Sequence, residues 1–221
     1  MLIRERMSQS VNYVTPETSV ADALNFMKSQ QVRRLPVLKR DKLVGIVSDK
    51  DLLNASPPRG TSLSAWELTY LLGKLTIGEI MSREVLTVTE DMPIEEAARI
   101  MADHKIGGLP VMRNGEVVGM ITETDLFKTF LEMMGARRHG VRLTVLVPEE
   151  PGQLARLTEA IASIGGNILA LGTFVGEHPS NRMVTCKIDG VELERVRARV
   201  EPLVERLVDI RETYLEQIMN E

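Results

Sequence analysis

The chain has 221 residues, of which 43% are apolar and 26% are charged, with a formal net charge of −4 at pH 7. This length accommodates two small domains, and the interleaved acids and bases form no basic stripe for nucleic acid. The apolar runs are too short to cross a membrane, and the start "MLIRERMSQS" lacks the core of a signal peptide. A single cysteine excludes an internal disulfide, so we expect a cytoplasmic protein. From the charge pattern and the short apolar runs, we expect neither nucleic-acid nor membrane partners.

The first 126 residues contain a repeat at an offset of 74 residues. Residues 7–52 align with 81–126 without a gap, and 14 of these 46 positions are identical. The phrase "GIVSDKDL" at 45–52 returns as "GMITETDL" at 119–126. A single spacing of this length indicates a tandem duplication rather than a solenoid.

Both copies show the same order of predicted elements, β-α-β-β-α. A short apolar strand (11–14 and 85–88) precedes a helix (19–31 and 93–105), capped by Ser19-x-x-Asp22 in copy one and opened by Pro93 in copy two. Two strands follow in each copy, at 35–38 and 43–47 and at 109–112 and 117–121. Asn114-Gly115 is a type I′ hairpin signal, and a second helix begins after each final strand.

The segment 54–80 connects the copies. Its first part has loop composition, and Ser64-x-x-Glu67 predicts a short helix that runs to about Leu72. Trp66 is interpreted as a packing residue or a subunit contact, in preference to a base-stacking one.

After a linker at 135–140, the pattern changes to β-α-β-β-α-β, which is a ferredoxin-like split βαβ. Gly165-Gly166 ends its first helix, and Pro202 implies either a kink or two shorter pieces in its second. Cys186 lies in an apolar alternation and is interpreted as a core residue. The predicted elements are strands at 141–147, 167–176, 181–188 and 208–214, and helices at 153–164 and 191–207.

The predicted fold class is therefore α/β (α+β), with two βαββα units and a βαββαβ domain. The expected boundaries are 1–60 for repeat 1, 61–76 for a linker helix, 77–134 for repeat 2, 135–140 for a linker, 141–214 for the C-terminal domain and 215–221 for a tail.

The repeated phrase has two chemical interpretations. Ser48 with Asp51, and Thr122 with Asp125, fit a helix cap worth about 1 kcal/mol each, which needs no ligand. The same groups suit a nucleotide, because a helix N-terminus attracts phosphate and an aspartate can accept from ribose hydroxyls. Composition alone leaves both open.

The landmarks "MSxxVxxVT", "LPV" and "VGIVSDKDL", kept in both copies, resemble a tandem cystathionine β-synthase (CBS) domain pair over residues 7–132. The resemblance implies two βαββα units packed together, with adenine nucleotides or S-adenosylmethionine bound in the cleft. It implies ribose contacts for Asp51 and Asp125, phosphate or ribose contacts for Ser48 and Thr122, and base contacts beside Gly45, Gly119, Thr15 and Thr89. Arg33 and Arg34 match a phosphate-binding place, although a solvated helix end is an equal alternative, and copy two has Gly107-Gly108 there.

Residues 141–214 resemble an ACT domain through "VPEEPGQLARL" and "IGGNILAL". That family pairs side by side and binds amino acids or similar effectors, which implies effector contacts for Glu149, Gly152, Gly166 and Asn167. Glu149 replaces the usual aspartate, and Glu150 stands where a basic residue is common, so a purely dimerising domain is the alternative.

A CBS pair followed by an ACT domain resembles the acetoin utilization protein B (AcuB) group, which implies a regulatory role near acetoin catabolism. We expect a sensor without obligatory cofactor that binds AMP, ADP, ATP or S-adenosylmethionine, forms a homodimer and acts on an unidentified protein target. No catalytic or metal-binding set is apparent, because His104, His139 and His178 lie far apart. The alternative is a dimerisation scaffold with empty clefts.

Overall fold

A computed structural model describes residues 1–55 and 73–213. The predicted helix from Ser64, with Trp66, and the tail at 215–221 lie outside these residues. The described chain divides into two compact units, Met1–Leu126 and Phe127–Glu221. This division falls inside a helix, α6 (Glu123–Met133), ahead of the linker expected at 135–140. No helix in the described ranges is both long enough and apolar enough to span a bilayer.

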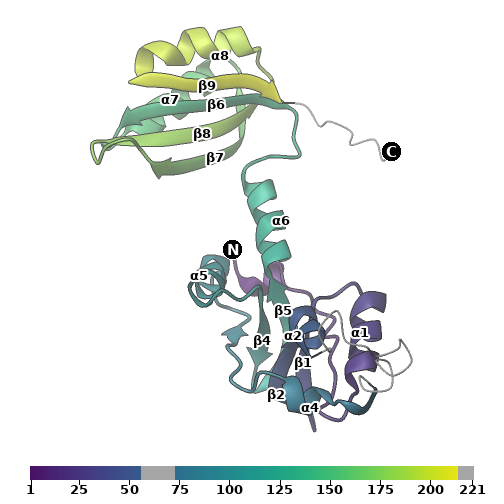
Figure 1. The fold of residues 1–221 in the computed structure, drawn as a ribbon. Helices are drawn as coiled ribbons and strands as arrows, with labels where there is room; N and C mark the ends of the chain where they lie inside the picture. The colour runs from purple at the N-terminus through teal and green to yellow at the C-terminus, as the bar shows by residue number, and fades with distance from the viewer. Residues whose placement is uncertain (56–72, 214–221) are drawn as a thin grey trace. The chain divides into compact units, whose positions relative to one another are not determined.

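Unit 1 contains both repeats, each with a small sheet and two main helices (Figure 1). Burial of residues at i, i+3 and i+7 fixes the helix face in each copy: Val20, Ala23 and Met27 in the first, and Ile94, Ala97 and Met101 in the second. The elements of repeat 1 are α1 (Val20–Ser29), β1 (Arg34–Lys39), β2 (Lys42–Ser48) and α2 (Asp49–Asn54), and those of repeat 2 are β3 (Val88–Thr89), α5 (Ile94–His104), β4 (Gly108–Arg113), β5 (Glu116–Thr122) and α6.

The first strand of each copy is shorter than predicted. Val14 makes only an isolated parallel bridge to Val37, and β3 is limited to two residues paired with β4. The hairpin prediction at Asn114-Gly115 is confirmed, since both residues have positive φ. Arg40 and Asp41 adopt the same conformation in copy one without a glycine, so the turn type is kept although its sequence signal is lost.

Two short helices at the starts of the copies pack into the opposite copy. Ile3 of η1 (Ile3–Glu5) belongs to the core of repeat 2, and Ile77 of α4 (Ile77–Ile80) belongs to the core of repeat 1. Both side chains are fully buried. The repeats are therefore interlocked, because each supplies a core residue to the other.

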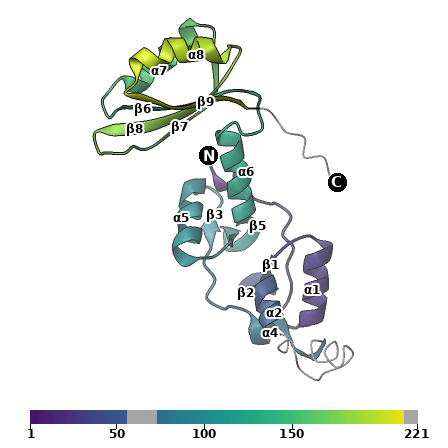
Figure 2. The same cartoon turned by 45° about the horizontal axis from the view of Figure 1, so that its top comes forward.

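Unit 2 is a four-stranded antiparallel sheet in the order β7-β8-β6-β9, with α7 and α8 on one face (Figure 2). This order confirms the ferredoxin-like prediction. Pro202 lies in the 3₁₀ turn η2 (Glu201–Leu203) directly after α8, so the second helix ends there rather than kinking. The elements are β6 (Gly140–Pro148), α7 (Gln153–Ser163), β7 (Asn167–Val175), β8 (Asn181–Asp189), α8 (Leu193–Val200) and β9 (Arg206–Thr213).

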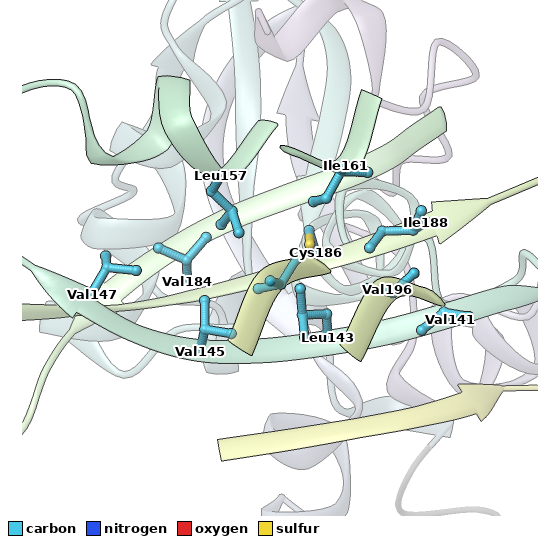
Figure 3. Close-up of a cluster of buried hydrophobic side chains, with 11 residues drawn as sticks. Val141, Leu143, Val145, Val147, Leu157, Ile161, Val184, Cys186, Ile188 and Val196 are labelled. Atoms are coloured by element: carbon cyan, nitrogen blue, oxygen red, sulfur yellow. The ribbon is translucent and has the colours of Figure 1, made fainter. Parts of the chain in front are cut away.

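The core of unit 2 lies between the sheet and these helices (Figure 3). Alternate residues of β6 and β8, such as Leu143 and Ile188, meet Leu157 and Ile161 of α7. Cys186 belongs to this core at 2% exposure, and burial raises the pKa of its thiol to about 12. Its interpretation as a core residue is confirmed.

Candidate functional site

A cleft of about 790 Å³ lies between the two repeats of unit 1. Its wall includes equivalent segments of both copies: the chain before each first strand, the chain before each "LPV", and the start of each second helix. The lining residues are Ser8, Ser10, Asn12, Gln31, Val32, Arg33, Arg34, Ile46, Ser48, Asp49, Lys50, Asp51, Ser82, Glu84, Val85, Leu86, Lys105, Ile106, Gly107, Gly108, Met120, Thr122, Glu123, Thr124 and Asp125.

Part of this wall is built by backbone pairing between the repeats. Ser8 of copy one and Met120 of β5 exchange two N–H···O bonds of 2.9 and 3.1 Å. Ser82 of copy two and Ile46 of β2 exchange two of 2.9 and 3.0 Å. The segments around Ser8 and Ser82, here called the crossing segments, therefore bring each copy against the final strand of the other.

Gly45 and Gly119 are needed for this crossing. A Cβ at Gly119 would lie 2.7 Å from the Met7 sulfur and 2.7 Å from the Ser8 carbonyl oxygen, and one at Gly45 would collide with Met81. Neither glycine lines the cleft. The space beside Gly45 is filled by Met81, and the space beside Gly119 by Met7. The close-packing role of these glycines accounts for their recurrence.

The two repeated cap motifs form as predicted and border the cleft. The Ser48 N–H and hydroxyl donate to Asp51 Oδ2 at 2.8 and 2.7 Å, and the Ser48 hydroxyl accepts from Asp51 N–H at 3.3 Å. The Thr122 N–H and hydroxyl donate to Asp125 Oδ2 at 2.9 and 2.6 Å. The cap interpretation is therefore confirmed in copy one, and copy two has the same bonds from Thr122 to its carboxylate; Asp51 and Asp125 both line the cleft.

Arg34 connects the two repeats. Its Nη1 donates to the Gly107 carbonyl oxygen at 2.8 Å, and a Cβ at Gly107 would collide with its guanidinium. A Cβ at Gly108 would lie 3.5 Å from Arg34 Cδ. Gly107 of copy two thus leaves the room that the guanidinium of Arg34 occupies.

Thr15 and Thr89 do not line the cleft. The Thr18 hydroxyl accepts from Thr15 N–H at 3.1 Å and lies 3.3 Å from the Thr15 hydroxyl. The Thr89 hydroxyl donates to Asp91 at 2.6 Å. Both side chains are engaged in their own turns, and their assignment to a base remains a prediction.

The sequence reasoning missed the crossing segments as part of the wall. Ser8, Ser10 and Asn12, with Glu84 and Leu86 of copy two, line the cleft but precede the motifs that suggested ligand contacts. The recurrence of Met7-Ser8 as Met81-Ser82 is the signal that could have found them.

The four candidate effector residues of unit 2 do not meet within one chain. Glu149 N–H donates to Ser180, next to the start of β8, whereas Asn167 pairs with Asp189 at its end. These ends are about 26 Å apart in a strand of this length. A single chain therefore cannot bring all four to one small ligand.

Each of these positions also has a structural role. Glu149 accepts a hydrogen bond from Arg182, Gly152 has φ +90 at the N-cap of α7, and a Cβ at Gly166 would lie 2.8 Å from Ile161. Effector binding at these positions stays a prediction.

The three histidines, His104, His139 and His178, are all exposed. Among the described residues, no group of three or more His, Cys, Asp or Glu side chains is placed to hold a metal ion.

Comparison with known proteins matches two families, one to the repeats and one to the C-terminal sheet domain. The CBS domain family matches residues 3–57 and 77–132, and the TTHA0829-like ACT domain family matches residues 139–211. The crystal structure of a protein named as an acetoin utilization protein (AcuB), from Vibrio cholerae, is 27% identical with a TM-score of 0.51, over 61% of this chain and 93% of that one.

Two further relatives cover the CBS repeats. A CBS domain-containing protein of Dictyostelium discoideum is 29% identical over 136 residues, which are 61% of this chain and 94% of that protein. CBSX2 of Arabidopsis thaliana is 32% identical over 144 residues, 57% of this chain and 60% of CBSX2. The structure of CBSX2 in complex with AMP matches with a TM-score of 0.50, at 32% identity over 59% of this chain and 96% of that one.

Proposed function

Because the chain belongs to the CBS-domain family and carries a TTHA0829-like ACT domain, we propose that it is a regulatory protein that binds an adenosine-containing nucleotide between its CBS repeats. CBS pairs are generally regulatory rather than catalytic. The observation that carries the proposal is the cleft of about 790 Å³, which both repeats border with a hydroxyl-carboxylate pair. CBSX2 in complex with AMP gives a precedent for the ligand class.

In this proposal the aspartates hold the ribose. The cap bonds of Asp51 use Oδ2, so Oδ1 would accept from the 2′- and 3′-hydroxyls while the cap stays intact. The Asp125 carboxylate would hold the ribose in copy two. The hydroxyls of Ser48 and Thr122 would add a bond to ribose or phosphate.

Arg34 would bind the phosphate, with Arg33 beside it on the cleft wall. A phosphate offers a charge-assisted, bidentate partner, which is a stronger acceptor than the Gly107 carbonyl that Arg34 now contacts. Binding would therefore draw Arg34 from repeat 2 to the ligand. Since the glycines of copy two leave room for the same arginine, we assign one principal phosphate position per CBS pair.

The wider parts of the proposal rest on the resemblances alone. These are a homodimer, a protein target, an amino-acid-like effector at the ACT domain and a link to acetoin utilization. For regulation, the nucleotide must bind two states of the protein with different affinities.

A dimerisation scaffold with an empty cleft is the second candidate. It is favoured by the caps and by Arg34, because all of these groups have partners within the protein. Under this alternative the recurrence of Ser/Thr-x-x-Asp reflects helix capping only.

Thermal unfolding with AMP, ADP, ATP, S-adenosylmethionine and adenosine separates the two candidates. A bound ligand at 100 times its dissociation constant should stabilise the protein by about 2.7 kcal/mol. We expect Asp51→Ala combined with Asp125→Ala to abolish this effect. Asp22→Ala is the matched control, because Asp22 closes the Ser19 cap of α1 away from the cleft. It should cost about 1 kcal/mol of stability and retain the ligand response.

Arg34→Gln tests the phosphate assignment. We expect AMP to bind at least tenfold more weakly to this variant, by calorimetry, and adenosine to bind as before. If no adenosine compound shifts the unfolding of the unmodified protein, the scaffold is the better description. Equal losses for AMP and adenosine would assign Arg34 a structural role only.

A further inference from the structure

The face of the unit 2 sheet opposite α7 and α8 has polar side chains that are removed from solvent. Thr144, Thr185 and Lys187 point to this face, because their neighbours Leu143, Cys186 and Ile188 point into the core (Figures 2 and 3). All three are only 4% exposed. The chain that follows α6 lies against this face, since a Cβ at Gly135 would be 3.4 Å from the Lys187 side chain.

A cavity of about 430 Å³ opens between this segment and the sheet. Its apolar wall comes from Phe130 and Met134 on one side and Ala170 of β7 on the other. Its polar wall includes Arg142 of β6 and Lys187 of β8. Volumes of a few hundred Å³ with few polar groups are typical of small-molecule sites.

The cavity has an excess of positive charge. Its described wall includes two cations and no acidic side chain. Arg142 pairs with Asp209 at 2.9 Å, and Arg211 also pairs with that carboxylate. The Lys187 ammonium donates to the Thr213 hydroxyl, and no ion pair within the described ranges includes it. Burial and the nearby Arg142 lower the pKa of Lys187.

A buried ammonium without a carboxylate partner is costly, so it is expected to have a counter-charge when the protein is functional. No acidic side chain of the described wall supplies one, so a bound ligand can take this role. An amino acid is a poor candidate, because no acidic side chain is available in the described wall for its ammonium group. A carboxylate with an apolar body matches both walls.

We propose that this cavity binds a small monocarboxylate with an apolar body, its carboxylate at Lys187 and Arg142 and its body between Phe130, Met134 and Ala170. The site is separate from the nucleotide cleft, which lies in unit 1, and from Glu149, Gly152, Gly166 and Asn167, and it stands independently of the proposed function.

Titration calorimetry on the full chain with sodium 4-methylpentanoate tests this assignment. We expect saturable binding at one site per chain, and at least tenfold weaker binding of the neutral 4-methylpentanamide. Lys187→Met and Arg142→Met should each weaken binding of 4-methylpentanoate at least tenfold. Arg195→Met removes one positive charge from an exposed position of α8 on the other face of the sheet, and it should bind like the unmodified protein.

The proposal is overturned if 4-methylpentanoate does not bind, if its amide binds equally well, or if Lys187→Met and Arg142→Met both bind it with unchanged affinity. Circular dichroism shows whether each variant is folded. If Lys187→Met or Arg142→Met does not fold, the other variant still tests the site.

Discussion

At Gly119, the crossing backbone of Ser8 leaves room for a hydrogen atom only. The close contacts are with Met7 and with a carbonyl oxygen that is itself paired to Met120, so the backbone cannot withdraw without breaking that pair. Gly45 meets Met81 and Ser82 in the same way. Each copy therefore needs glycine at this position, because the backbone of the other copy packs directly against it.

We expect Gly119→Ala to destabilise the protein by about 1–3 kcal/mol, because the added methyl group overpacks this contact. Gly73→Ala is the control, since an added Cβ there meets nothing within 4 Å. Chemical denaturation of both variants measures the difference. A Gly119→Ala variant as stable as Gly73→Ala would show that the crossing segment moves freely.

Lys187 should reduce stability in the absence of a ligand. We expect Lys187→Met to raise the free energy of unfolding by about 1 kcal/mol near neutral pH, because it removes a buried charge next to Arg142. The native pKa of Lys187 is lowered from 10.5. The penalty is therefore complete below the native pKa and disappears as the pH rises toward 10.5. Denaturation of both proteins at about pH 7 and about pH 10 checks the sign, and an advantage of Lys187→Met that fails to shrink at the higher pH contradicts it.

At the scale of elements, the crossing segments bind the two repeats into one unit. η1 and α4 are too short to be stable helices in isolation, and each is held by a buried isoleucine in the other copy. The same exchange places Ser8 and Ser82 at the cleft wall. Movement of one repeat against the other would therefore change the shape of the cleft.

Ile3→Ala and Ile77→Ala should have similar effects. Both side chains are fully buried at equivalent positions, so we expect each variant to lose about 2–5 kcal/mol of unfolding free energy. Hydrogen exchange should show the loss of protection first in β4 and β5 for Ile3→Ala, and in β1 and β2 for Ile77→Ala. Loss of protection confined to the copy that contains the substitution would contradict the exchange of core residues.

At the scale of the whole molecule, the two units have separate cores and separate cavities. The cleft proposed to bind a nucleotide is built entirely from residues of unit 1, and the cationic cavity entirely from residues of unit 2. Each ligand should stabilise the unit that binds it.

Scanning calorimetry of the full chain should show this separation. We expect AMP to raise the transition temperature of unit 1 and 4-methylpentanoate to raise that of unit 2. The isolated CBS pair identifies which transition belongs to unit 1. A single transition that both ligands shift equally would instead show strong coupling between the units.

The sequence alone determined the duplication, the order of elements in both units and the helix caps. These features depend on local periodicity and on residues a few positions apart, such as Ser48 with Asp51. The same local patterns indicated the ferredoxin-like order and the burial of Cys186.

Only the tertiary structure decided which segments exchange between the repeats and which candidate residues meet. Arg34 approaches Gly107 and Gly119 approaches Ser8 through contacts between segments more than 70 residues apart, and no local pattern encodes such proximity. For the same reason, spacing did not reveal that Glu149 and Asn167 lie at opposite ends of a sheet, or that Lys187 is buried beside Arg142.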